Sequence, residues 1–121
     1  MFDQLEAVHA RFQEVEAQLQ DPAIVTDPKK LRDLTKLRAE LEPVVGAFER
    51  QRVLKRQLDE AESILGDRSM DKELRDMAEL EIPDLKKGIE SGEAELRRLL
   101  IPKDPNDAKN IILEEIGRAH V

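Results

Sequence analysis

Apolar residues recur every three or four positions along most of the chain, which is the spacing of one face of an α-helix. The first stripe covers about residues 2–20 and ends where Asp21 precedes Pro22, because proline cannot continue helical hydrogen bonding. Its members are Phe2, Leu5, Val8, Phe12, Val15 and Leu19. We therefore expect a first helix over about 2–20.

A second stripe covers about residues 28–65 and follows Asp27 and Pro28, a good N-cap and a residue suited to the first helical position. The polar Gln51 interrupts this stripe, and Gly66 after it suits a helix C-cap. Its members are Leu31, Leu34, Leu37 (or Arg38), Leu41, Val44 or Val45, Phe48, Leu54, Leu58, Ala61 and Leu65.

A third stripe covers about residues 69–100, where Asp67 or Ser69 can cap the start and Pro102 ends the helix. Gly92 fills one slot of the stripe, between two apolar positions. Its members are Leu74, Ala78, Ile82, Leu85, Ile89, Leu96 and Leu99.

Two prolines, Pro43 and Pro83, lie inside the second and third stripes. An interior proline costs a helix about 3 kcal/mol. We therefore expect a bend or a break within one turn of each proline. Both a simple kink and a functional hinge fit that expectation.

Three such stripes joined by short connections predict an all-α fold, because short connections place successive helices side by side and antiparallel. The expected architecture is an elongated antiparallel helical hairpin or a three-helix, coiled-coil-like bundle over residues 1–102. Helices of this kind are stable through the packing of their apolar faces rather than alone.

Composition narrows the class of protein. The chain has 20 Lys and Arg against 27 Asp and Glu, a net charge of −7, and no Cys. The absence of Cys excludes disulfides and thiolate metal sites, and the acidic balance disfavours a dedicated nucleic-acid binder. No apolar run approaches the roughly 20 residues of a membrane span, and the first residues do not form a signal peptide. We expect a cytoplasmic protein with no membrane contact.

The sequence contains almost no combination of residues that is typical of a catalytic site. His9 lies at the border of the first stripe and His120 lies far away in the tail, so neither suggests a metal ligand or a base. No HExxH motif, Gly-rich phosphate loop or nucleophile motif occurs. We expect no enzymatic activity, cofactor, metal or small-molecule ligand.

One local reversal of charge stands out, at Arg50, Arg52, Lys55 and Arg56. The last three share a helix face, at positions i, i+3 and i+4. They can form the charged flank of a coiled coil. They can also form a patch for an acidic surface, such as RNA phosphate or an acidic protein. Arg52, Lys55 and Arg56 are the candidate interaction patch.

The segment after the third stripe is the most specific in the chain: residues 99–114 read LLIPKDPNDAKNIILE. It resembles the stretch that ends the helical N-terminal domain of bacterial class I peptide chain release factors of the type that reads UAA and UAG. Residues 41–45, LEPVV, and residues 5–12, LEAVHARF, are also similar to that family. The resemblance covers about residues 1–114.

This resemblance implies a piece of a translation termination factor. The full-length factors direct peptidyl-tRNA hydrolysis at a stop codon, through a Gly-Gly-Gln loop and a codon-reading tripeptide. Neither motif is in this sequence, so no decoding or catalytic residue can be assigned to it. The resemblance implies a ribosome-binding arm that reaches toward the stalk base, while the full-length protein also contacts the mRNA stop codon and rRNA.

The tail departs from the family pattern. Residues 103–115 are interpreted as a linker and the truncated start of the next domain. Residues 116–121 read IGRAHV, which is the translation of a widely used sequencing adapter, and are interpreted as a non-native tail. The alternative to the termination-factor interpretation is a free-standing coiled-coil adaptor or chaperone-like interaction protein.

Overall fold

The computed structural model describes residues 2–101, and these residues fold into four helices with no strand. Their bounds are α1 Phe2–Gln18, α2 Pro22–Val25, α3 Pro28–Leu65 and α4 Lys72–Leu100. The all-α fold class is therefore confirmed. The expected linker at 103–115 and the expected non-native tail at 116–121 lie outside the described residues.

The chain divides into two compact units. Of the described residues, the first unit holds 2–46 and 98–101, and the second runs from Ala47 to Arg97. Helix α3 contributes residues to both units.

Two aspartates start the helices that follow α1. Asp21 Oδ1 accepts the Ala23 N–H at 3.0 Å and begins α2, a single turn that the apolar pattern did not predict. Asp27 Oδ1 accepts the N–H groups of Lys29 and Lys30 at 3.1 and 3.2 Å and begins α3, as the sequence predicts. Each cap satisfies backbone donors that the first helical turn leaves unpaired.

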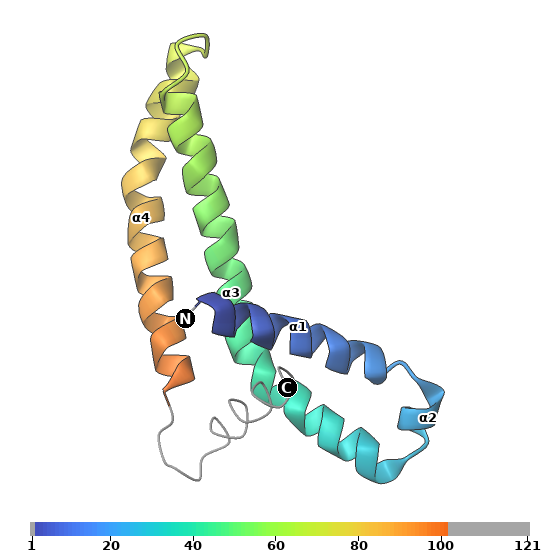
Figure 1. Cartoon of the computed structure of the whole chain (residues 1–121). Helices are drawn as coiled ribbons and strands as arrows, with labels where there is room; N and C mark the ends of the chain where they lie inside the picture. Colours follow the sequence, from blue (N-terminus) through green and yellow to red (C-terminus); the bar gives the residue numbers. More distant parts are fainter. Residues whose placement is uncertain (1, 102–121) are drawn as a thin grey trace. The chain divides into compact units, whose positions relative to one another are not determined.

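In the first unit, α1 lies beside the N-terminal half of α3, and α2 joins them (Figure 1). The apolar positions of α1 from Leu5 to Val15 are buried as predicted, whereas Phe2 is 54% exposed and Leu19, just beyond the end of α1, is half-buried. The core of this unit contains Leu5, Val8, Phe12, Val15, Leu41, Val44 and Val45.

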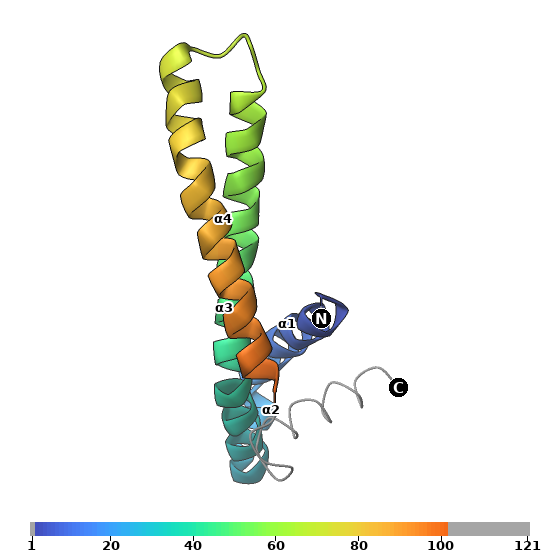
Figure 2. The same cartoon turned by 90° about the vertical axis from the view of Figure 1, so that its left-hand side faces the viewer.

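In the second unit, the C-terminal half of α3 and helix α4 form an antiparallel pair (Figures 1 and 2). Position 92 faces Gln51 and position 88 faces Leu54, so the order of contacts reverses between the helices. Its buried residues are Ala47, Phe48, Gln51, Ala61, Ala78 and Leu96.

The turn between α3 and α4 differs from the expectation. Helix α4 begins at Lys72, so neither Asp67 nor Ser69 is its N-cap. Asp67 Oδ1 instead accepts the Ser69 N–H at 2.9 Å and the Ser69 Oγ–H at 2.6 Å, which stabilises the turn itself. Gly66 ends α3 without the left-handed conformation, since no described glycine has a positive φ.

A break at either proline is wrong, whereas a bend at these positions stays a prediction. Helix α3 is continuous through Pro43, and α4 is continuous through Pro83. Each proline leaves one carbonyl, at residues 39 and 79, without its usual backbone donor. Both prolines and both of these residues lie on exposed sides of their helices, so water can take the place of the missing N–H.

Candidate interaction surface

The predicted basic patch lies on the outside of α3. Arg52, Lys55 and Arg56 are all exposed. The Arg52 guanidinium carbon lies 5.1 Å from the centroid of the Phe48 ring, a cation–π contact that restrains Arg52 while its donors stay accessible. The i, i+3, i+4 spacing places the three cations within about one helical turn. Such a cluster can bind phosphate or carboxylate oxygens.

The other residues of the basic stretch limit the size of this patch. Arg50 is engaged elsewhere, because its Nη2 lies 3.3 Å from Glu95 Oε1 on α4. Asp59 lies four residues after Lys55 and three after Arg56, so it adds one negative charge to the same side of the helix. Among the described residues, no ion pair involves Lys55 or Arg56. The accessible cluster therefore contains three cations.

Gln51 is a buried polar residue that the apolar pattern left out of the core. Its side chain is 4% exposed, and its Nε2 donates to the Ile89 carbonyl oxygen at 2.7 Å. A Cβ atom at position 92 would overlap Gln51 Oε1 and lie 3.0 Å from Gln51 Cδ. The signal was present in the sequence, since Gln51 and Gly92 each interrupt an apolar stripe.

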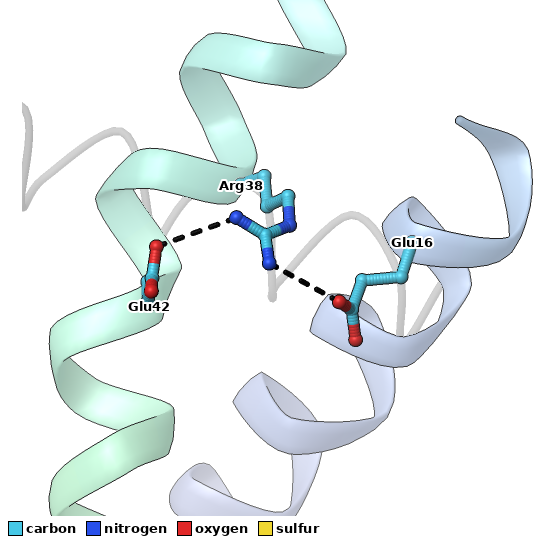
Figure 3. Close-up of polar contacts among 3 residues, drawn as sticks. All are labelled: Glu16, Arg38 and Glu42. Carbon is cyan, nitrogen blue, oxygen red and sulfur yellow. Dashed lines mark hydrogen bonds and ion pairs between the residues drawn. The ribbon is translucent and has the colours of Figure 1, made fainter. Parts of the chain in front are cut away.

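Arg38 links α1 to α3 in the first unit (Figure 3). Its Nη2 lies 3.2 Å from Glu16 Oε2 on α1, and its Nη1 lies 3.4 Å from Glu42 Oε2 on α3. Its guanidinium carbon also lies 5.2 Å from the centroid of the Phe12 ring. This cluster therefore joins two helices of the first unit.

The remaining candidates for a functional site are the two histidines and a groove between α3 and α4. His9 is half-buried on α1, and His120 lies outside the described residues. Over residues 2–101 there is no cluster of His, Cys, Asp or Glu that could hold a metal ion, and no helix suited to cross a membrane. A groove of about 430 Å³ between α3 and α4 has a mixed lining of Gln57, Glu60, Ala61, Ile64, Glu81 and Leu85.

Comparison with known proteins identifies a family. The PCRF domain matches residues 8–117. The chain is 42% identical over 119 residues to peptide chain release factor 1 of Listeria welshimeri, covering 98% of this chain and 33% of that protein. It is 43% identical over 114 residues to peptide chain release factor 1 of Geobacillus kaustophilus, covering 94% of this chain and 32% of that protein.

The chain thus spans about a third of the length of the curated relatives it matches. No solved structure matches the chain. The matched range 8–117 contains the KDPND sequence at residues 103–107 and the LEPVV segment at 41–45. It also contains residues 8–12 of the segment at 5–12.

Proposed function

The chain belongs to the PCRF-domain family, and from this premise we propose that it is the ribosome-binding arm of a translation termination factor. The observation that carries the proposal is the 42% identity to peptide chain release factor 1 over 98% of the chain. Stop-codon-dependent peptidyl-tRNA hydrolysis belongs, in this proposal, to the full-length factor. The 121 residues contain no Gly-Gly-Gln sequence, so the arm itself contributes binding rather than catalysis.

Arg52, Lys55 and Arg56 are the proposed contact with the ribosome, at rRNA phosphates of the stalk base. Three exposed cations on one helical turn favour a polyanionic backbone, and a guanidinium can bind two phosphate oxygens at once. The chain has a net charge of −7, so binding to RNA phosphates needs a local cluster of cations such as this one. A small cationic patch on an otherwise acidic chain can orient the chain on the ribosome while it limits non-specific binding to RNA.

Binding of the 121-residue chain to purified ribosomes tests the proposal. We expect measurable binding that weakens with salt, and a loss of about tenfold or more when Arg52, Lys55 and Arg56 are all changed to Glu. A matched control reverses Lys72, Lys86 and Lys87, three exposed cations of α4, and gives the same change in net charge. Equal losses of affinity in the two triple variants would show that the patch is not the contact. If the unaltered chain does not bind ribosomes, the proposal that it is a ribosome-binding arm is wrong.

A second assay tests the division of labour. Ribosomes carrying peptidyl-tRNA at a stop codon should release no peptide when the 121-residue chain is added. Turnover by this chain would contradict the proposal that it is a binding module.

A further inference from the structure

A second surface lies on α4, near the turn that joins it to α3 (Figure 2). Positions 73, 76, 77, 80, 81 and 84 follow the spacing i, i+3, i+4, i+7, i+8 and i+11, which defines one face of a helix. The residues are Glu73, Asp76, Met77, Leu80, Glu81 and Asp84, and all are exposed. We call this the Met77–Leu80 face.

The two apolar residues of this face are unusually accessible. Leu80 is 76% exposed and Met77 is 56% exposed, whereas the core-facing Ala78 is 3% exposed. Single exposed apolar side chains are normal on protein surfaces. Here two of them are neighbours along one ridge, at i and i+3, and Leu74 adds a third apolar side chain at the edge, 45% exposed.

Carboxylates surround this apolar pair. Between residues 73 and 84 the face carries four acids and no base, and the exposed Lys87 follows one turn later. Among the described residues no ion pair involves any of the four acids. Negative charge of this density repels RNA, anionic lipid and a second copy of the same face. It attracts a partner with lysine or arginine around an apolar centre.

We propose that the Met77–Leu80 face binds a basic amphipathic helix of another protein. The face is about 16 Å long, from 1.5 Å per residue over eleven residues, which matches about three turns of a partner helix. Apolar residues of the partner at i, i+3 or i+4, and i+7 would cover Met77 and Leu80. Its flanking lysines or arginines would pair with Glu73, Asp76, Glu81 and Asp84.

A designed peptide serves as the probe. It is helical, with leucine at i, i+3, i+4 and i+7 and lysine on both flanks, and its control has glutamate in place of every lysine. Calorimetric titration of the 121-residue chain should show binding of the lysine peptide that weakens with salt, and no binding of the glutamate peptide. Binding of both peptides, or of neither, would overturn the proposal.

Variants locate the site. The double change Met77→Gln and Leu80→Gln should weaken binding by about tenfold or more, because two apolar anchors are lost. Val53→Gln, at an α3 position that is 39% exposed, is the matched control and should leave affinity unchanged. Likewise, Glu73→Gln with Asp84→Asn should weaken binding, while Glu60→Gln with Glu62→Gln, an equal change of charge on α3, should not.

Two further measurements check the stability of the apolar variant and the occupant of the face. The melting temperature of the Met77→Gln and Leu80→Gln variant should match that of the unaltered chain, since both side chains are exposed. In sedimentation, the unaltered chain should not dimerise through this face. A dimer that the Met77→Gln and Leu80→Gln variant abolishes would mean that a second copy occupies the face. Ribosome binding through Arg52, Lys55 and Arg56 should be unaffected by the variant, so the two proposals fail independently.

Discussion

The Gln51 side chain occupies the space that a methyl group at position 92 would fill. Its Nε2 donates to the Ile89 carbonyl oxygen, one turn before Gly92 on α4. The absence of a side chain at 92 therefore makes room for a buried amide, and the amide ties α3 to α4. A glycine inside a helix costs about 1 kcal/mol relative to alanine, and this contact is the reason for the glycine here.

Gly92→Ala should destabilise the protein by about 1–2 kcal/mol, although alanine is the better helix former. The new Cβ would displace the Gln51 amide, break its bond to Ile89 and leave buried polar atoms without partners. The free energy of unfolding, from urea denaturation followed by circular dichroism, measures the effect.

The same substitution should have the opposite sign when Gln51 is Ala. In that background Gly92→Ala meets no amide and should stabilise by up to about 1 kcal/mol through helix propensity. Gly88→Ala is the second control, because its Cβ would lie 3.3 Å from Leu54 Cδ1, the flexible end of a side chain, and should cost less than Gly92→Ala. Additive effects of the Gln51 and Gly92 changes would contradict the coupling.

Helical periodicity was sufficient to predict the long helices and most of their buried faces. Periodicity did not predict that Gln51 is buried, because this polar side chain is buried through its contact with α4. The breaks that the sequence allowed at Pro43 and Pro83 do not occur, because exposed helix sides tolerate a lost hydrogen bond. Local rules offered Asp67 or Ser69 as the cap of α4, but the helix begins at Lys72, because Asp67 binds Ser69 within the turn instead.

The basic patch could be predicted in part. Sequence spacing groups Arg52, Lys55 and Arg56 on one side of a helix, and all three are exposed on α3, while their role in binding stays a prediction. The same spacing left Arg50 outside this group, but it could not predict the partner of Arg50, because that partner is Glu95, which is 45 residues away in the chain. The apolar stripe of the third helix left out Leu80, which is 76% exposed, but it included Leu74, which is 45% exposed at the end of α4 that lies nearest the turn.

The two aspartate caps should differ in their contribution to stability. Asp27→Ala should cost about 1 kcal/mol, because it removes an acceptor from two N–H groups at the start of a 38-residue helix. Asp21→Ala should cost less, because it caps a four-residue helix through one N–H. Thermal unfolding of the two variants measures the difference, and equal losses would mean that α2 matters as much as the start of α3.

The turn at Asp67 should depend on pH. The Ser69 hydroxyl and then the Ser69 N–H donate to this carboxylate and hold its pKa below the ordinary value of 3.8. A folded-state pKa below the unfolded value means that the turn is fully stabilised above about pH 4 and loses this stabilisation as the pH falls through the folded-state pKa. An NMR titration of the Asp67 carboxyl carbon should show a midpoint below 3.8.

Ser69→Ala provides the test of that cause. It removes the hydroxyl donor, which is the largest contribution, so the midpoint for Asp67 should move up toward 3.8. Ser63→Ala, at an exposed position of α3, should leave the midpoint in place. A midpoint that does not respond to Ser69→Ala would show that the hydroxyl does not hold the pKa down.

Arg38→Ala should destabilise the first unit by about 1 kcal/mol. Exposed ion pairs each contribute about 0.2–1 kcal/mol, and a cation–π contact at an exposed site adds about 0.5–1 kcal/mol. Arg38 combines both, since it contacts Glu16, Glu42 and the Phe12 ring. Arg97→Ala, which removes one exposed pair with Glu93 within a single helix, is the control and should cost less than half as much. Urea denaturation compares them; equal effects would mean that Arg38 acts only through its charge pairs along α3 and does not hold α1.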